Sequence, residues 1–392
     1  MSRRRLLILG STGSIGENTL RVIADNPDRF DVAALAAGSN WEKLSDQARA
    51  FSPRLVSVAD PTDGERLREA LPAGIRVLSG EEGLREVAAG AGAGIVVSAL
   101  VGAAGLAPTL AAIESGASIA LANKEVLVMA GELVTGRARE RSLPLLPIDS
   151  EHAGVFQILN GRAPGAEVDR IILTASGGPF RDLSIGALRD VTCEAALRHP
   201  TWKMGPKITI DSASLMNKGL ELIEARWLFG LAPERVDVLI HPESVVHALV
   251  EFVDGSVLAQ MSVPDMRISI SQALCYPDRV PCQAPRLDLA QRGSLTFGEP
   301  DLTRFPCLSH AKAALAEGGT SPAVLNAANE VAVAAFLDAR IGFMDIPALV
   351  GTALDDHQNG KAESLEAVME ADRWAREFTA SRLNGMRTPV RS

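Results

Sequence analysis

Residues 199–224 carry polar side chains whose types and spacing suit a phosphorylated, metal-bound ligand. Asn217 and Glu221 are four residues apart, and Lys218 and Glu221 are three apart, so on a helix they share one face. Together with Ser212 just before them, they offer hydrogen-bond donors to a phosphate and a carboxylate to a cation. Taken alone, the spacing is more typical of a solvated Lys–Glu pair on a surface helix.

Asp149 and Glu151 form a second candidate group. In an extended chain they point to the same side with Cα atoms roughly 7 Å apart, so both carboxylates can reach one hard cation. The competing interpretation is a helix N-terminus, with Ser150 as the cap and the acids in the first turn. Both interpretations can hold at once.

Two glycine-containing loops suit anions. Gly10, Gly13 and Gly16 follow G-x-x-G-x-x-G between an apolar strand and a helix start, a variant of the dinucleotide fingerprint. Such glycines let the backbone turn tightly and present N–H groups to a pyrophosphate, so the loop predicts nucleotide binding. A second loop, 176–178 (SGG), offers a hydroxyl and free amides to an anion, although a simple turn is an equal alternative.

Apolar strands alternate with helical patterns up to residue 150, which predicts a doubly wound parallel sheet covered on both faces. Sites in such sheets lie beyond the carboxyl ends of the strands, which places 123–125 (NKE) and 149–151 (DSE) on the functional edge. The predicted strands end near residues 38, 60, 100, 123 and 150, and the predicted helices between them include 64–71, 107–116 and 125–140.

The pattern changes after residue 150. A hairpin with Asp254-Gly255 as its turn predicts antiparallel strands and a second, α+β domain, and 211–229 predicts one helix. Helical spacing in 306–317, 321–338, 344–356 and 363–383 predicts a C-terminal helix bundle. The predicted division is therefore 1–149 for nucleotide binding, 150–275 for catalysis, metal binding and dimerisation, 276–300 as a linker and 301–392 as a helical domain.

The turn after the second strand indicates which dinucleotide is bound. Gly38, Ser39 and Asn40 are small and neutral, and the nearest acid is Glu42, so the turn leaves room for a 2′-phosphate and favours NADP. Further on, an irregular loop from His199 to Gly205 carries Trp202 and Met204 and resembles a lid that closes over a ligand, with an ordinary packed loop as the alternative. On a strand, His241 and His247 lie too far apart to share a metal ion, so we interpret both as structural.

Composition restricts the partners. The chain has 392 residues and a formal net charge of −9, which argues against nucleic acid or an anionic membrane as a bulk partner. Its 4 cysteines form no C-x-x-C pair, so neither a zinc site nor a disulfide framework is indicated. The apolar run Leu6–Leu9 is too short for a signal sequence or a membrane span, and we expect a cytoplasmic protein.

Seven motifs resemble one enzyme family in its own order along nearly the whole chain. They are GSTGSIG, LANKE, IDSEH, SGGPF, HPTWKMGPKITIDSASLMNKGLELIEA, HPESVVH and NAANE. They are similar to 1-deoxy-D-xylulose-5-phosphate reductoisomerases. The resemblance implies a homodimeric oxidoreductase that uses NADPH and one divalent cation, Mg²⁺ or Mn²⁺. It would isomerise and reduce 1-deoxy-D-xylulose 5-phosphate to 2-C-methyl-D-erythritol 4-phosphate, in the methylerythritol phosphate route to isoprenoid precursors.

The resemblance also implies roles for individual residues. The metal ligands would be Asp149, Glu151 and Glu221, and the catalytic set adds Lys124 and His199 to them. The substrate would contact Lys124, Ser150, Glu151, Ser176, His199, Ser212, Asn217, Lys218 and Glu221. Its phosphate would be held largely by Ser176, Ser212, Asn217 and Lys218, and its sugar portion would contact Lys124, Ser150 and His199. Whether His199 shuttles a proton or positions the substrate stays open. The cofactor would contact Thr12, Gly13, Ser14, Ile15, Gly38, Ser39, Asn40, Asn123, Glu125 and Gly205.

The implied cation and cofactor suit the two steps of this reaction. A hard cation can polarise the sugar ketone for either a retro-aldol/aldol sequence or a direct 1,2-shift, and NADPH then reduces the resulting aldehyde. Some members of the family carry Lys where this chain has Ser39, so the strength of the NADP preference stays open.

The sequence leaves two alternative functions. They are another two-domain NADP-dependent oxidoreductase of the semialdehyde or homoserine dehydrogenase type, or a non-enzymatic nucleotide-sensing module.

Overall fold

The computed structural model describes residues 3–202 and 204–385, and its contacts divide the chain into two compact units. The predicted boundaries at residues 149, 275 and 300 stay a prediction. The first unit takes the residues up to Val126, Val134–Ala153 and Asp265–Pro285, and the second takes Leu127–Leu133, Gly154–Pro264 and the residues from Arg286 on.

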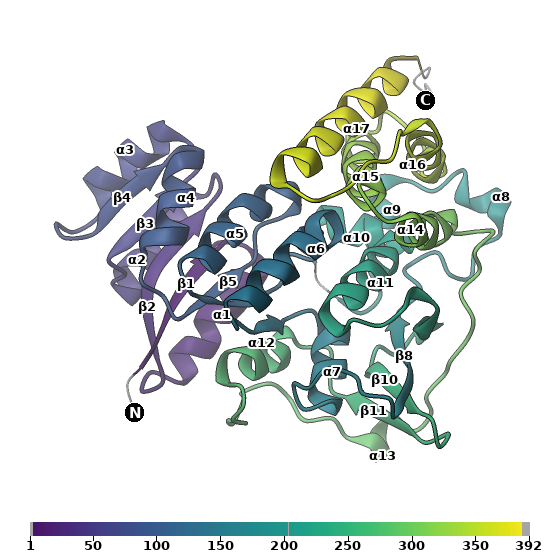
Figure 1. Ribbon diagram of the computed structural model, residues 1–392, viewed down its shortest axis with the longest axis horizontal. Helices are drawn as coiled ribbons and strands as arrows, with labels where there is room; N and C mark the ends of the chain where they lie inside the picture. The colour runs from purple at the N-terminus through teal and green to yellow at the C-terminus, as the bar shows by residue number, and fades with distance from the viewer. Residues whose placement is uncertain (1–2, 203, 386–392) are drawn as a thin grey trace. The chain divides into compact units, whose positions relative to one another are not determined.

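The first unit is built on a seven-stranded sheet in the order β4-β3-β2-β1-β5-β6-β7, with every neighbouring pair parallel (Figure 1). The apolar run of β1 explains its central place, because Leu6, Leu7, Ile8 and Leu9 are all 0 % exposed. The prediction of a parallel α/β sheet is confirmed. The strands are β1 Arg4–Leu9, β2 Phe30–Ala37, β3 Leu55–Val58, β4 Arg76–Ser79, β5 Ile95–Ser98, β6 Ser118–Leu121 and β7 Leu145–Pro147.

The strand order reverses between β1 and β5, which makes the sheet doubly wound. Right-handed crossovers then put α1–α3 on one face and α4 and α5 on the other, and the loops after β1 and β5 meet at the reversal point. β4 and α4 were not predicted from the sequence, where the glycines and alanines of α4 obscure its helical pattern. The helices are α1 Ser14–Asp25, α2 Trp41–Phe51, α3 Pro61–Ala70, α4 Gly80–Gly90, η1 Gly102–Gly105, α5 Leu106–Glu114 and α6 Glu125–Glu140.

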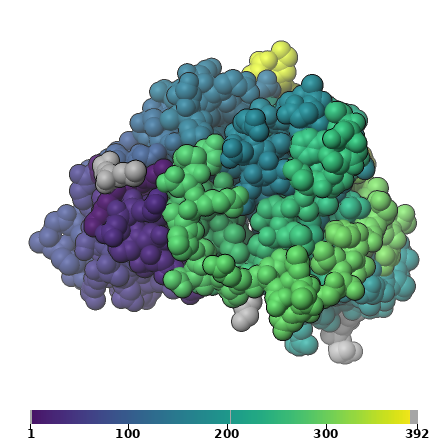
Figure 2. All heavy atoms as spheres, turned by 90° about the horizontal axis from the view of Figure 1, so that it is seen from below, coloured from purple at the N-terminus to yellow at the C-terminus, as the bar shows by residue number. Residues whose placement is uncertain are grey.

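A helix from much later in the chain, α12 (Met266–Cys275), completes one face of this unit. Figure 2 shows green atoms of this part of the chain against the purple atoms of the N-terminal segment. Arg4 Nη1 on β1 donates to the carbonyls of Leu274 at 2.8 Å and Tyr276 at 2.9 Å. These contacts attach α12 to the seven-stranded sheet, although 118 residues, 148–265, separate it from β7 in sequence.

The second unit contains a four-stranded sheet in the order β11-β10-β8-β9. β10 pairs antiparallel with both β8 and β11, and the predicted turn at Asp254-Gly255 is confirmed. The prediction of antiparallel strands is therefore confirmed for β8, β10 and β11. β9 was not predicted, and it pairs parallel with β8 because α8–α11 provide the long crossover that parallel pairing needs. The strands are β8 Val168–Ala175, β9 Val236–Ile240, β10 Val246–Phe252 and β11 Val257–Met261.

The helices of the second unit confirm the predicted C-terminal bundle but correct the predicted single helix over 211–229. That segment is split between α10 and α11, because Leu215 adopts a left-handed φ of 60°. Ser212 and Asn217 therefore lie on different helices. Across the two units the remaining helices are α7 Ser150–Ile158, α8 Ile185–Leu188, α9 Cys193–Ala196, α10 Pro206–Ala213, α11 Met216–Phe229, η2 Pro233–Arg235, α13 Leu289–Arg292, α14 Pro306–Glu317, α15 Ser321–Leu337, α16 Asp345–Asp356 and α17 Leu365–Gly385.

Close packing in the second unit depends on a glycine in α11. A Cβ on Gly219 would lie 2.5 Å from the Cβ of Ala311, so only glycine lets α14 approach this closely. The core around this contact contains Leu220 and Ile223 of α11 and Leu308 of α14, all buried. No helix within residues 3–202 and 204–385 is long and apolar enough to cross a membrane.

Candidate functional site

The glycine loop after β1 lies where the strand order reverses, and its glycines, Gly10, Gly13 and Gly16, have different structural roles. Gly10 has a φ of +86°, and a Cβ there would lie 2.4 Å from the carbonyl oxygen of Ala99 after β5. A Cβ on Gly16 would lie 2.3 Å from the carbonyl oxygen of Gly10. Gly13 is the N-cap of α1, with a φ of −80°, and is exposed beside Ser14. Gly10 and Gly16 therefore shape the turn, while Gly13 leaves the helix N-terminus open to an anion.

The turn after β2 carries no cation of its own. Gly38, Ser39 and Asn40 are all exposed, and Asn40 caps α2 by accepting from the Lys43 N–H at 3.0 Å. The Lys43 ammonium donates to a carboxylate oxygen of Glu17 on α1. The nearest lysine in sequence is therefore ion-paired with Glu17.

Asn123, after β6, presents a buried acceptor that suits a bound ligand. Its Nδ2 donates to the carbonyl of Gly102 at 3.0 Å, which fixes the orientation of the amide. Its Oδ1 is buried and has no hydrogen-bond partner in the part of the chain that the structure describes. Because a buried acceptor without a donor is costly, a ligand donor such as a nicotinamide carboxamide fits there. Glu125, the first residue of α6, is also buried.

Lys124 and Asp149 meet at the carboxyl ends of β6 and β7, as the sheet topology predicts. The Lys124 ammonium forms an ion pair with Asp149, and the two side chains are 6 % and 15 % exposed. Ser150 is the first residue of α7, not the residue before it, and its hydroxyl donates to Glu151 Oε2 at 2.5 Å. The alternative that Ser150 caps this helix is therefore wrong.

On α11 the Lys–Glu pair is not solvated. The side chains of Lys218 and Glu221 are 3 % and 1 % exposed, which contradicts the surface-pair interpretation. Asn217 Nδ2 donates to Glu221 Oε1 at 2.5 Å, and the Lys218 ammonium donates to Oε2. Two side chains from the preceding turn therefore converge on one buried carboxylate, an arrangement that is costly unless the charges are compensated.

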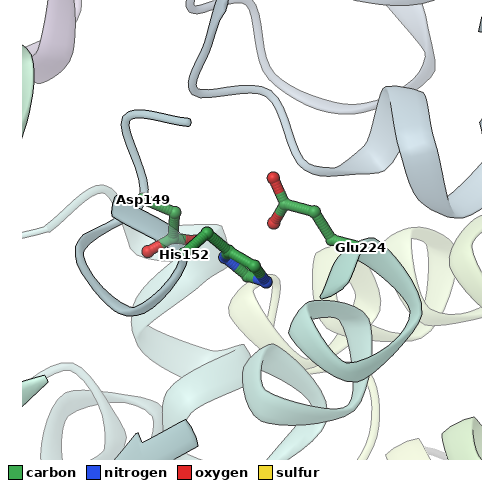
Figure 3. Close-up of side chains that lie close together, drawn as sticks. All are labelled: Asp149, His152 and Glu224. Atoms are coloured by element: carbon green, nitrogen blue, oxygen red, sulfur yellow. The ribbon is translucent and has the colours of Figure 1, made fainter. Parts of the chain in front are cut away.

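Two groups of side chains have the composition of a cation site. Asp149, Glu151 and Glu221 each offer a carboxylate oxygen within 4.8 Å of the others. Ligand atoms of Asp149, His152 and Glu224 are equally close (Figure 3). The all-oxygen group is the one that suits Mg²⁺ or Mn²⁺, since the other brings an imidazole nitrogen.

His152 and Glu224 were missed at the sequence level. Both are 0 % exposed. Glu224 follows Glu221 by three residues and Asn217 by seven, so the helical period that selected Glu221 also indicates Glu224. His152 directly follows Glu151 in the IDSEH motif.

A second cluster joins the SGG loop to α10 through His199. His199 Nε2 lies 3.0 Å from Ser176 Oγ and 3.1 Å from Ser212 Oγ. The N–H of Gly178 donates to Ser176 Oγ at 3.2 Å. Of the two interpretations of the SGG loop, an anion-binding loop is favoured over a simple turn, because two hydroxyls, an imidazole and a backbone amide meet at one point.

The backbone sets the tautomer of His199. Its Nδ1 accepts from the N–H groups of Thr201 at 3.1 Å and Trp202 at 2.9 Å, so the ring proton is on Nε2. Burial lowers the pKa of His199 from 6.5 to about 4, so the ring is neutral at pH 7. Nε2–H is therefore a hydrogen-bond donor between the two serines.

Gly178 brings the SGG loop against α10. Its φ is +68°, and a Cβ there would lie 2.9 Å from both the carbonyl oxygen of Ser212 and the Cα of Ala213. Because both neighbours are backbone atoms, they cannot move aside as a flexible side chain would. Glycine at this position therefore permits the short distances from Ser176 and Ser212 to His199.

The predicted lid, His199–Gly205, includes residue 203, which lies outside the described residues. Trp202 lies with its ring centroid 6.2 Å from that of His247, and Gly205 is the N-cap of α10. The structural interpretation of His241 and His247 is confirmed. His241 Nε2 accepts from the N–H groups at 245 and 246, each at 3.2 Å, and His247 Nε2 lies 2.9 Å from Ser262 Oγ.

The NAANE motif lies on α15. Asn326 Nδ2 donates to Glu330 Oε1 at 3.0 Å, and Glu330 Oε2 accepts from Arg376 of α17 at 2.6 Å. The sequence allows Asn326 and Glu330 either to reach the site or to serve packing, and these contacts favour packing between helices of the C-terminal bundle. Asn329, which the sequence did not single out, instead donates to Asp211 of α10 at 2.8 Å.

Comparison with known proteins agrees with the geometry along almost the whole chain. Residues 6–131 match the family model of 1-deoxy-D-xylulose 5-phosphate reductoisomerase, and 145–229 and 261–378 match two models of its C-terminal domains. The enzyme of that name from Heliobacterium modesticaldum is 55 % identical over 383 residues, covering 97 % of each chain. The chain belongs to the 1-deoxy-D-xylulose 5-phosphate reductoisomerase family.

Solved reductoisomerase structures have the same fold. The enzyme from Zymomonas mobilis in complex with NADPH is 44 % identical with a TM-score of 0.91, covering 98 % of this chain and 100 % of that one. A reductoisomerase in complex with NADPH, fosmidomycin and magnesium is 42 % identical with a TM-score of 0.92, covering 97 % and 98 %. The α/β fold class is therefore confirmed for the chain as a whole.

Membership of this family replaces the two alternatives raised from the sequence. Three of the four cysteines are also poorly suited to a thiol mechanism of the dehydrogenase type. Burial raises the pKa of Cys307 to about 12, and burial likewise raises the pKa of Cys193 and Cys275. Such thiols stay protonated and are poor nucleophiles at neutral pH.

Proposed function

We propose that the protein converts 1-deoxy-D-xylulose 5-phosphate into 2-C-methyl-D-erythritol 4-phosphate with NADPH and one divalent cation, Mg²⁺ or Mn²⁺. This is a step of the methylerythritol phosphate pathway to isoprenoid precursors. The observation that carries the proposal is the group of three carboxylate oxygens, from Asp149, Glu151 and Glu221, within 4.8 Å of one another. In a two-domain NADP enzyme, three converging carboxylates are explained by a reaction in which a hard cation binds the sugar.

Asp149, Glu151 and Glu221 would hold the cation, since hard cations take carboxylate oxygens. A bound cation of this kind supplies Lewis-acid polarisation of a carbonyl. The other hydrogen bonds of these carboxylates keep them in place, with Asn217 and Lys218 on Glu221 and Ser150 on Glu151. Such outer contacts orient metal ligands.

Ser176, Ser212, Asn217 and Lys218 would take the substrate phosphate, with His199 between the two serines. Their donors are hydroxyls, an amide, an ammonium and the Nε2–H of a neutral ring. A neutral His199 at pH 7 positions the phosphate end by donating a hydrogen bond, which we favour over the role of proton shuttle. The phosphate then anchors the sugar while its other end reacts.

Lys124 and Ser150 would contact the sugar portion. The Lys124 ammonium is almost fully buried beside Asp149, so it is a rigid donor toward an oxygen that gains negative charge. NADPH supplies the hydride that reduces the aldehyde. Thr12, Gly13, Ser14 and Ile15 at the open side of the glycine turn, with Gly38–Asn40, Asn123, Glu125 and Gly205, are the residues that we assign to it. Trp202 in the loop between His199 and Gly205 would exclude water from the reacting groups.

An assay of NADPH oxidation tests the proposal. The purified protein should oxidise NADPH only when 1-deoxy-D-xylulose 5-phosphate and Mg²⁺ or Mn²⁺ are both present. EDTA should abolish turnover, and added Mn²⁺ should restore it. Turnover that persists in EDTA would count against the cation. NADPH binding without turnover of this substrate would favour a nucleotide-sensing module instead.

We also propose a homodimer, and the outer strand of the second sheet supports it. β11 pairs only with β10 within the described residues, and Val257 and Leu258 on it are 46 % and 52 % exposed. An exposed apolar edge strand is a template for another strand, and a second copy would cover it. Leu258→Glu should lower the molar mass in analytical ultracentrifugation toward the monomer, whereas Leu289→Glu on α13, equally exposed, should not. An unchanged mass for Leu258→Glu would exclude β11 from the interface.

The remaining parts of the proposal concern organisation and location. We assign cofactor binding to residues 1–149, catalysis and dimerisation to 150–275 and a supporting role to the helices of 301–392. The four cysteines are all free thiols in the structure, which supports a reducing compartment, and we place the protein in the cytoplasm. Nucleic acid and membranes are not among the proposed partners, in keeping with the net charge of −9.

A further inference from the structure

We propose that Asp211 of α10 and Asn329 of α15 are a positioning pair that fixes the rotation of α10 and so places Ser212 for the substrate phosphate. The inference rests on the proposed phosphate-binding role of Ser212. It gives a function to Asn329, the residue of the NAANE motif that contacts α10.

The contact lies in a fully buried environment. Asn329 Nδ2 donates to Asp211 Oδ1 at 2.8 Å, and the two residues are 0 % and 1 % exposed. The second carboxylate oxygen of Asp211 lies 2.9 Å from the Lys207 ammonium, one turn earlier on the same helix. A carboxyl group at this depth needs such partners, and Asn329 supplies one from outside α10.

Ile210 and Ala213 hold the apolar side of α10 in the core, and the contact of Asp211 with Asn329 adds a polar constraint on its rotation. α10 is 8 residues long, and it begins directly after the irregular loop that carries His199 and Trp202. It ends at the left-handed residue Leu215, so α11 does not continue its axis. A short helix between two irregular segments can turn about its own axis, and a buried polar contact on one face opposes that rotation.

Asp211 and Ser212 are consecutive, so their side chains leave the helix about 100° apart. Asp211 contacts α15, while Ser212 Oγ lies 3.1 Å from His199 Nε2. If α10 rotates by about 20°, an atom about 3 Å from its axis moves by about 1 Å. A misplacement of that size at a reacting or anchoring group can cost about 10²-fold in rate.

The chain contains a matched control for this contact. Asn326 and Asn329 lie on the same helix, both 0 % exposed, and each donates one side-chain hydrogen bond to a carboxylate. The acceptor of Asn326 is Glu330 on α15 itself, so its loss should affect stability without turning α10. Asn326→Ala therefore measures the structural cost of removing a buried asparagine from this helix.

Asn329→Ala should raise KM for 1-deoxy-D-xylulose 5-phosphate at least tenfold, while the Kd for NADPH, measured by fluorescence, stays unchanged. Asn326→Ala should lower the melting temperature comparably and leave KM within twofold of wild type. Equal KM values in the two variants would overturn the positioning role and leave Asn329 as a structural residue.

Exchanging donor and acceptor supplies the second variant. Asn329→Asp alone sets two carboxylates against each other and should raise KM further than Asn329→Ala. Combined with Asp211→Asn it recreates an amide–carboxylate contact and should return KM to within about threefold of wild type. Failure of the folded double variant to improve on Asn329→Asp would contradict the proposal.

Ser212→Ala tests the phosphate-binding role of Ser212 separately from the positioning role of Asp211 and Asn329. If Ser212→Ala leaves KM unchanged, the proposed role of Ser212 is wrong and the positioning pair has no function to serve. If Ser212→Ala raises KM and Asn329→Ala does not, the phosphate site stands and the positioning pair is wrong.

Discussion

Glu221→Gln is expected to lower kcat by about 10³-fold while NADPH binding stays unchanged. The amide keeps the shape of the side chain but replaces an anionic ligand by a neutral one, and hard cations bind it less strongly. Loss of several kcal/mol of charge stabilisation in the transition state corresponds to a factor of this size. The buried Lys218 also loses an anionic partner, so the melting temperature should fall.

Steady-state assays at increasing Mg²⁺ or Mn²⁺ provide the measurement, together with NADPH binding followed by fluorescence. Glu224→Gln is the informative comparison, because Glu224 belongs to the group with Asp149 and His152. If the all-oxygen group holds the cation, Glu221→Gln should lose far more activity than Glu224→Gln and should need more metal. The reverse order of effects would assign the cation to the group that contains His152.

Much of the fold could be predicted because local patterns determine it. Leu6–Leu9 of β1 form a continuous apolar run and are fully buried, and α14–α17 follow their helical periodicity to within about two residues. The errors have tertiary causes. Nothing local requires Leu215 to adopt a φ of 60°, so the break between α10 and α11 was missed. The parallel pairing of β8 and β9 depends on a crossover of about 60 residues and is not a property of either strand.

The candidate site was predictable to the extent that its residues are neighbours in sequence. The face shared by Asn217, Lys218 and Glu221 follows from helix geometry. Its burial does not, because the spacing alone is more typical of a solvated pair, whereas the structure buries Lys218 and Glu221. The meeting of Ser176, His199 and Ser212 does not follow, because it requires three separate segments to converge. For the same reason Asp211 and Asn329, 118 residues apart, carried no signal.

Gly178→Ala is expected to raise KM for the substrate by at least tenfold and to destabilise the fold by several kcal/mol. Two costs add. A φ of +68° costs a non-glycine residue about 1 kcal/mol or more, and the new Cβ would lie 2.9 Å from the backbone of Ser212 and Ala213. To relieve the contact the SGG loop must move away from α10, which separates Ser176 from Ser212. KM and chemical denaturation measure the two effects.

Gly230 separates the effect of the clash from that of backbone conformation. Its φ is +67°, almost the same as at Gly178, but a Cβ there would meet nothing within 4 Å. Gly230→Ala should therefore show only the conformational cost, about 1 kcal/mol of stability, with KM unchanged. If both variants lose the same stability and neither changes KM, the close approach of the loop to α10 does not determine the phosphate site. A tenfold rise in KM confined to Gly178→Ala would mean that the two serines bind the phosphate only when this glycine holds their segments in contact.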